Sequence, residues 1–155
     1  MNLQSFDIGF MRLAIAASRE AAEQGNTPFG AVLTQGEQML LSAGNEQVTT
    51  GDCTAHAELA LVRKAQQQLG PPALRGATVY ASGEPCAMCA GAMFWAGIQR
   101  IVYAATKDDI ALALGDPNLP IDCASTLAGA SPAVSVEGPL LREEASAILR
   151  RFGIR

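Results

Sequence analysis

Two short motifs, thirty positions apart, place the strongest constraint on how this chain can fold. They are His56-Ala57-Glu58 and Pro85-Cys86-Ala87-Met88-Cys89. One imidazole and two thiols are donor groups that proteins use to bind zinc. A helix that begins at Cys86 carries both thiols on one side of its first turn, where the positive end of the helix dipole favours the thiolate. The fold must therefore bring the starts of two helices to one point.

Glu58 is a carboxylate that a structural zinc site does not need. Three protein ligands leave a fourth position for water, which is the pattern of catalytic zinc. Glu58 would accept the proton of that water and later pass it on. It can lie near the metal together with His56 only at a helix end, where side chains project past the last turn. The alternative is an acidic residue that merely complements the helix dipole.

A closed, structural zinc site is the competing interpretation. Cys53 precedes His56 by three positions, so the chain also contains a CxxH…CxxC pattern with four ligands. Glu58 beside His56 and Pro85 directly before Cys86 favour the open site. Cys53 is then expected to be a small buried thiol, and Cys123 a packing residue.

The composition limits the class of protein. The chain has 155 residues, 49% of them hydrophobic and 17% charged, as is typical of one globular domain. Its net charge of −4, with only two Lys and nine Arg, disfavours sequence-independent binding to nucleic acid. Neither a membrane span nor a signal-peptide pattern is found, and a CxxC among four Cys indicates free thiols in the cytoplasm.

Hydrophobic spacing and turn residues predict alternating helices and strands. Residues 45–53 are expected to form a loop, and residues 106–131 to contain short helical pieces. Helices are expected over residues 5–24, 54–69, 85–95 and 139–152, and strands over 30–34, 39–42, 77–81, 100–105 and 133–136. The first two strands form an antiparallel hairpin, whereas helical crossovers make later strands parallel. We therefore predict a single domain over residues 1–155, a three-layer α/β/α fold with a mixed five-stranded sheet.

The two motifs resemble the H-x-E…P-C-x-x-C signature of the zinc deaminases of the cytidine deaminase superfamily. Further stretches resemble the purine-type branch, which holds bacterial guanine deaminases and tRNA adenosine deaminases. They are Pro28-Phe-Gly-Ala-Val-Leu33, Gly44-Asn45, Thr54-Ala-His-Ala-Glu58 and Glu84-Pro-Cys-Ala-Met-Cys-Ala-Gly-Ala92. The resemblance implies a cytidine deaminase-like fold, a zinc cofactor, and hydrolytic removal of an exocyclic amine from a nucleobase.

The resemblance also implies roles for individual residues. His56, Cys86 and Cys89 would hold the metal. Glu58 would protonate a ring nitrogen and help ammonia leave, and the backbone N–H of Ala57 would hold an oxygen of the base. Asn45 would contact the base or its sugar, because an amide both donates and accepts hydrogen bonds. The alternative for Asn45 is an ordinary turn residue after Gly44.

Two aromatic residues and one acid complete the predicted site. Phe29 and Trp95 are candidates for stacking on a flat ring, although both positions are also typical of a core. In the tRNA enzymes His-Ser usually stands where this chain has Trp95-Ala96, so a Trp would narrow the pocket around a free base. Asp109 would accept protons from the leaving amine, or else it caps the helix that follows the fourth strand.

Three functions stay open at this point. The favoured one is deamination of a small-molecule nucleobase or nucleoside, with guanine as the leading substrate. The second is tRNA adenosine deamination, for which the arginines from Arg142 onward would supply a basic patch. These cations also suit a helix C-terminus, and Glu143 and Glu144 dilute them. The third is the closed zinc module. Because relatives are commonly dimers, we also expect a homodimer, with the apolar helix 86–96 available as an interface.

Overall fold

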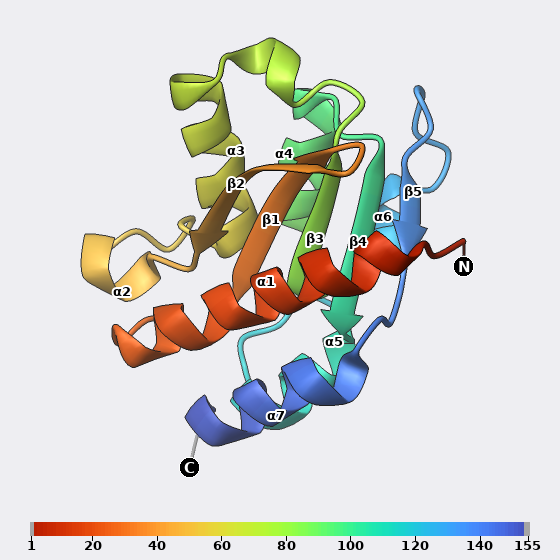
Figure 1. Ribbon diagram of the computed structural model, residues 1–155. Coiled ribbons are helices and arrows are strands. Elements are labelled where there is room, and N and C mark those ends of the chain that lie inside the picture. The colour runs from red at the N-terminus through yellow and green to blue at the C-terminus, as the bar shows by residue number, and fades with distance from the viewer. Residues whose placement is uncertain (1, 154–155) are drawn as a thin grey trace.

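The protein folds around a five-stranded mixed sheet with the strand order β2-β1-β3-β4-β5 (Figure 1). The structure is a computed structural model and describes residues 2–153. The strands are β1 (Gly30–Gln35), β2 (Gln38–Gly44), β3 (Thr78–Gly83), β4 (Arg100–Ala105) and β5 (Ser135–Glu137). β1 is antiparallel to both β2 and β3, whereas β3, β4 and β5 are parallel to one another. The predicted mixed sheet is confirmed.

The main helices also match the predicted order. They are α1 (Ser5–Glu23), α3 (Ala57–Gln68), α4 (Ala87–Ala96), α5 (Lys107–Leu114), α6 (Cys123–Leu127) and α7 (Arg142–Phe152). Two short pieces were not predicted, the single turn α2 (Gln47–Thr50) and the 3-10 helix η1 (Pro71–Ala73). α2 lies within the expected loop 45–53. The side chain of Asn26 stabilises it by accepting hydrogen bonds from the backbone amides of Val48 and Thr49.

Alternation along the strands divides the core into two layers. Leu33, Val79 and Ile101 face α3, α4 and α6, and all three are fully buried. Their neighbours Val32, Tyr80 and Val102 face α1 and α7 on the other side. Successive side chains of a strand point to opposite faces, so helices must cover both sides of this sheet. Figure 1 shows α1 crossing one face, with α3 and α4 on the other.

A buried ionic network joins the layers near the start of β4. Asp7 of α1 is fully buried and receives two hydrogen bonds from the guanidinium of Arg100, at 2.8 and 3.1 Å. The Tyr80 hydroxyl donates to the same carboxylate. Arg100 also donates to Glu137 of β5, at 2.7 Å. Burial by itself raises the pKa of Asp7, but the hydrogen bonds from Arg100 and Tyr80 outweigh it and hold the pKa below its ordinary value.

Replacing Asp7 by Asn tests this network. Removal of one partner of a buried ion pair leaves the other charge unsatisfied, so we expect a loss of about 3 kcal/mol in the free energy of unfolding at pH 7. Because the pKa of Asp7 is lowered by folding, its contribution is present above the unfolded-state pKa of about 3.9 and is lost as the pH falls below it. Urea titrations should therefore show a smaller difference between wild type and Asp7→Asn at pH 3 than at pH 7. An equal difference at both pH values would contradict the assignment.

Candidate active site

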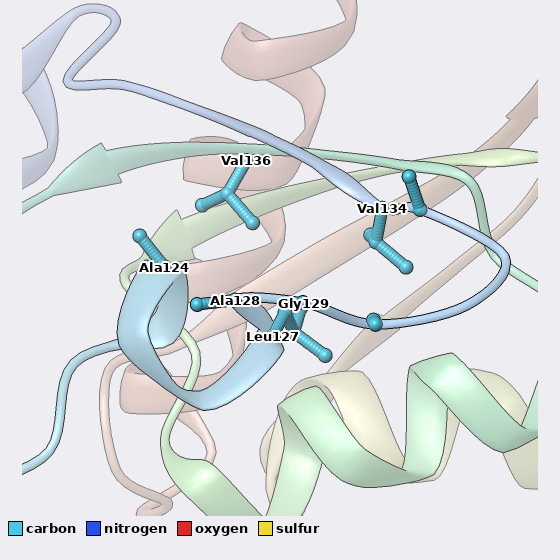
Figure 2. A pocket seen from close by; sticks show the side chains of 8 residues that line it. Ala124, Leu127, Ala128, Gly129, Val134 and Val136 are labelled. Atoms are coloured by element: carbon cyan, nitrogen blue, oxygen red, sulfur yellow. The ribbon is translucent and has the colours of Figure 1, made fainter.

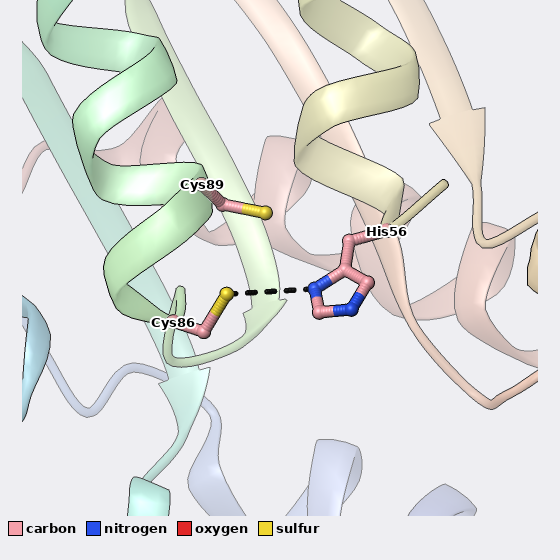
Figure 3. Close-up of side chains that lie close together, drawn as sticks. All are labelled: His56, Cys86 and Cys89. Atoms are coloured by element: carbon pink, nitrogen blue, oxygen red, sulfur yellow. Dashed lines mark hydrogen bonds between the residues drawn. The ribbon is translucent and has the colours of Figure 1, made fainter. Parts of the chain in front are cut away.

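His56, Cys86 and Cys89 come together where two helices begin. His56 is the N-cap residue of α3, Cys86 is the N-cap residue of α4, and Cys89 lies in the first turn of α4. Figure 3 shows the imidazole pointing from the start of α3 toward both sulfur atoms. Nδ1 of His56 lies 3.5 Å from Sγ of Cys86, and one donor atom from each of the three residues lies within 4.8 Å of the others.

This geometry fits tetrahedral zinc. Ordinary zinc–sulfur and zinc–nitrogen bonds place an N and an S ligand of one ion about 3.6 Å apart, close to the distance between His56 and Cys86. Within residues 2–153 this cluster holds three potential ligands, and Cys53 is not one of them. Cys53 is exposed, so the expectation of a buried thiol was wrong, whereas Cys123 is buried as expected. The open, three-ligand site is the arrangement that the structure contains.

The electrostatics of the cluster prepare it for a cation. A hydrogen bond from the Cys89 thiol and a second from His56 lower the pKa of Cys86 to about 4, despite its partial burial. The same hydrogen bond to Cys86, together with burial, raises the pKa of Cys89. The pKa of His56 is raised, mainly by its hydrogen bond to Cys86. The lowered pKa of Cys86 favours the thiolate form that binds a metal ion.

Glu58 lies next to this cluster, in the first turn of α3, and is almost completely buried. Burial, with a smaller contribution from the neighbouring Cys86, raises its pKa to about 7. His56 and Glu58 thus share one helix end, as expected for two residues that act on one metal. Ala57 between them is buried at the first helical position, where the helix does not use the backbone N–H.

A pocket of about 630 Å³ opens beside His56, Glu58 and Cys86. One side is formed by residues around α2 and the start of α3, and the opposite side by residues 107–121. Most of its lining is apolar. A second hollow of about 320 Å³ lies between α6 and β5 (Figure 2). Its lining residues are Ala, Leu, Gly and Val, so it offers no group for catalysis.

Phe29 lines the main pocket and also packs against the core, so its stacking role stays a prediction. Its ring packs on the backbone of Gly83 at the end of β3. A Cβ atom at position 83 would lie only 2.6 Å from Cε1 of Phe29 and 3.0 Å from Ile110. Any side chain at Gly83 would therefore displace the Phe29 ring, so the close packing of this ring requires glycine here.

Asn45 is buried, and its side chain is engaged within the chain. Its Nδ2 donates to Oε1 of Gln47 at 2.7 Å, and its Oδ1 accepts from the backbone N–H of Gln47 at 2.9 Å. Gln47, rather than Asn45, lines the pocket. The structure thus gives Asn45 the turn geometry that was its alternative, and places a different amide at the pocket surface.

Asp109 is not brought to the pocket either. Its carboxylate accepts from the backbone N–H of Thr106 at 2.9 Å, in the capping box of α5. Both oxygens also accept from Arg142 of α7, each at 2.8 Å, which lowers the pKa of Asp109. These contacts match the capping alternative. They direct the carboxylate toward α7, whereas Lys107 and Ile110 of the same helix line the pocket.

Trp95 lies outside the pocket on the surface of α4. The residue is 83% exposed, whereas Phe94 beside it packs against the core. α4 directs Cys89 and Met93 inward, so helical periodicity places Trp95 on a different face. The structure therefore does not bring Trp95 into contact with a substrate bound in the pocket of the same chain.

Sequence reasoning missed several pocket residues, notably Gln47, Glu84 and Lys107. Glu84 begins the stretch from Glu84 to Ala92 that carries the family resemblance, but the resemblance implies no role for it. Its position two residues before Cys86 is the sequence feature that indicates a place near the pocket. Gln47 and Lys107 carried no signal, because their places depend on how α2 and α5 pack against the rest of the chain.

Comparison with known proteins identifies the family. Residues 4–105 match the model of the cytidine and deoxycytidylate deaminase zinc-binding region. A probable cytosine deaminase of Schizosaccharomyces pombe is 35% identical over 151 residues, which cover 92% of this chain and 90% of that protein. A tRNA-specific adenosine deaminase of Agrobacterium fabrum is 43% identical over 96 residues, 62% of this chain and 63% of that protein, which is less than two thirds of its length.

A solved structure adds a third comparison. The guanine deaminase of Bacillus subtilis is 37% identical, with a TM-score of 0.64 over 70% of this chain and 69% of the other. The chain therefore belongs to the cytidine and deoxycytidylate deaminase family. It is a zinc-dependent deaminase, and His56, Cys86 and Cys89 form a cluster that could hold the zinc. Within residues 2–153 we find no helix with the length and apolar character needed to cross a bilayer.

The metal site predicts that the cysteines differ in their importance for zinc binding. Cys86→Ser and Cys89→Ser should each lose most of the bound zinc, because each removes one of three protein ligands. Cys53→Ser is the matched control and should keep about one zinc per chain. Elemental analysis of the purified proteins measures the difference. Loss of zinc from Cys53→Ser would show that the site has a fourth sulfur ligand.

Proposed function

We propose that this protein deaminates a free nucleobase or nucleoside, preferably a guanine-type purine, and releases ammonia. The observation that carries the proposal is the pocket itself. Its largely apolar walls, with Phe29 on one side and residues 107–121 on another, adjoin the metal ligands and Glu58. A flat, uncharged heterocycle fits such a space, because apolar walls bind its faces while polar groups at one end fix its orientation.

The reaction exchanges an exocyclic amine for a carbonyl oxygen derived from water. Bound zinc would supply the Lewis acidity that makes water nucleophilic near neutral pH. Glu58 accepts the proton released from that water, delivers it to the ring nitrogen, and carries a proton to the departing amine, so that ammonia leaves. The backbone N–H of Ala57 holds an oxygen of the base. His56, Cys86 and Cys89 would hold the zinc beside Glu58.

The distribution of charge supports a small substrate over a polyanion. Most cationic side chains of residues 2–153 are already paired with carboxylates. These are Arg12, Arg19, Arg63, Lys64, Arg100, Arg142 and Arg150. Arg142, the first arginine of the suspected basic patch, is held by Asp109. Binding to tRNA depends on cations that are available to phosphates.

Two other substrates have specific support. The similarity to the S. pombe protein over almost the whole chain favours cytosine as a free base. The similarity to the A. fabrum protein favours adenosine in tRNA as the second candidate function. Guanine remains our first choice because the pairing of most cations disfavours tRNA and because a guanine deaminase is among the structural relatives.

Ammonia release from a panel of substrates tests the proposal. The panel contains guanine, cytosine, isocytosine, adenine, their nucleosides, and an anticodon stem-loop. We expect the highest kcat/KM with guanine and no turnover of the stem-loop. Turnover of the stem-loop alone would establish the tRNA function instead, and a clear preference for cytosine would reject the purine assignment.

Glu58→Gln is the matched control for that panel. It keeps the size of the side chain but cannot accept the proton, so kcat should fall by roughly 10³-fold while zinc content stays unchanged. Loss of zinc would mean that Glu58 supports the metal. Full activity with zinc bound would remove Glu58 from the mechanism.

We also propose that the protein acts as a cytoplasmic homodimer. Trp95 is 83% exposed, and Met88, on the same side of α4, is also exposed. An apolar surface of this kind beside a pocket is suited to contact with a second copy. Because Met88 also lines the pocket, such an interface would lie close to the active site.

Replacing Trp95 by Glu tests the dimer. The change places a charge in the centre of the proposed interface, so the molar mass measured by light scattering should fall from that of two chains to that of one. Leu112→Glu is the control, because Leu112 is 90% exposed but lies on α5. A wild-type protein that is monomeric at micromolar concentration would refute the proposal.

A further inference from the structure

The wall of the pocket formed by residues 107–123 is held mainly at its two ends. Within the described part of the chain, no backbone hydrogen bond links residues 116–121 to another element. These residues are also exposed to solvent, apart from the faces that line the pocket. Apart from the packing of α5 against α7, the position of this wall therefore depends on how α5 and α6 are anchored where they begin.

Glu84 anchors both helices with one carboxylate. Its Oε1 accepts from the backbone N–H of Lys107 at 2.9 Å, and its Oε2 accepts from the backbone N–H of Cys123 at 3.1 Å. Lys107 and Cys123 are the first residues of α5 and α6, so neither N–H has a partner within its own helix. A carboxylate at two helix N-termini also interacts favourably with both helix dipoles.

Glu84 is itself held firmly. Its backbone N–H donates to the carbonyl oxygen of Ala105 at 2.8 Å, which continues the pairing of β3 with β4. It directly precedes Pro85 and the metal ligand Cys86. The residue therefore connects the metal-binding half of the site to the opposite wall. That wall lies beyond residue 105, where the match to the family model ends.

We infer that Glu84 is a positioning residue that fixes the 107–123 wall over the substrate pocket and thereby sets the affinity for the base. Although Glu84 lines the pocket, both of its carboxylate oxygens are engaged by backbone amides, and it acts through these two contacts. This inference rests on the proposed function only in taking this pocket as the place where the base binds.

Glu84→Gln tests the inference with the full-length, zinc-loaded protein. The amide retains one acceptor oxygen, so one anchor and the negative charge are lost. Without substrate, amide hydrogen exchange in peptides covering residues 107–123 should become faster, while peptides covering residues 47–58 on the opposite wall stay unchanged. With the best substrate of the panel, KM should rise by roughly tenfold, the factor that corresponds to one hydrogen bond to a charged group, and kcat should change little.

Two controls make the outcome decisive. Glu37→Gln removes the same charge from the exposed β1–β2 turn and should alter neither exchange nor KM. Glu84→Asp keeps the charge but is too short to hold both amides, so it should give an intermediate effect, and it decides the question if Glu84→Gln does not fold. Unchanged exchange of the wall, loss of zinc, or a fall in kcat at constant KM would each overturn the inference. The hydrogen-exchange measurement needs no substrate. If no substrate of the panel is turned over, it still tests the role of Glu84, so failure of this inference can be distinguished from failure of the proposed function.

Discussion

The meeting of two helix N-termini is the constraint on which the site depends. α3 and α4 both direct the positive ends of their dipoles at one point, an arrangement that favours anions there. The Cys86 thiolate supplies that negative charge, and His56 contacts it from the neighbouring helix. The parallel β3–α4–β4 unit brings the start of α4 to the end of β3, where α3 already begins. The packing that forms the fold therefore also places the metal ligands next to one another.

The rest of the molecule differs in how firmly its parts are held. At the start of β4, Asp7 and Arg100 join α1 to the sheet through a buried, bidentate ion pair. At the opposite ends of the strands, the pocket is bounded by short helices and connections. Besides the local caps at Thr106 and Asp122, side chains from other elements bind their first backbone amides, Asn26 for α2 and Glu84 for α5 and α6. Rigid packing positions the metal ligands, whereas a few hydrogen bonds shape the space in front of them.

Much of the fold could be predicted, because its signals are local. The alternation of Val32 and Leu33 identifies a strand covered on both faces, and the spacing of Cys86 and Cys89 places both thiols on one side of a helix start. The metal ligands followed from the same short-range geometry. Glu58 could be placed for the same reason, since it lies within one turn of His56.

What could not be predicted depends on contacts between distant elements. Asp109 is directed away from the pocket by Arg142, 33 positions later in the chain, and no local pattern indicates that pairing. Asn45 is engaged by Gln47 within a turn whose shape depends on Asn26. The exposure of Trp95 follows from which face of α4 meets the core, and its apolar character suggested the opposite.

The double attachment of Glu84 has a consequence for how such a protein diversifies. The starts of α5 and α6 are both tied to the residue before Pro85 through backbone amides, which every residue except proline possesses. Insertions, deletions and exchanges within the connection between the two helices can therefore accumulate while both helix starts stay in place. New substrate preferences can arise in this way from one catalytic apparatus, without any change in the residues that perform the reaction.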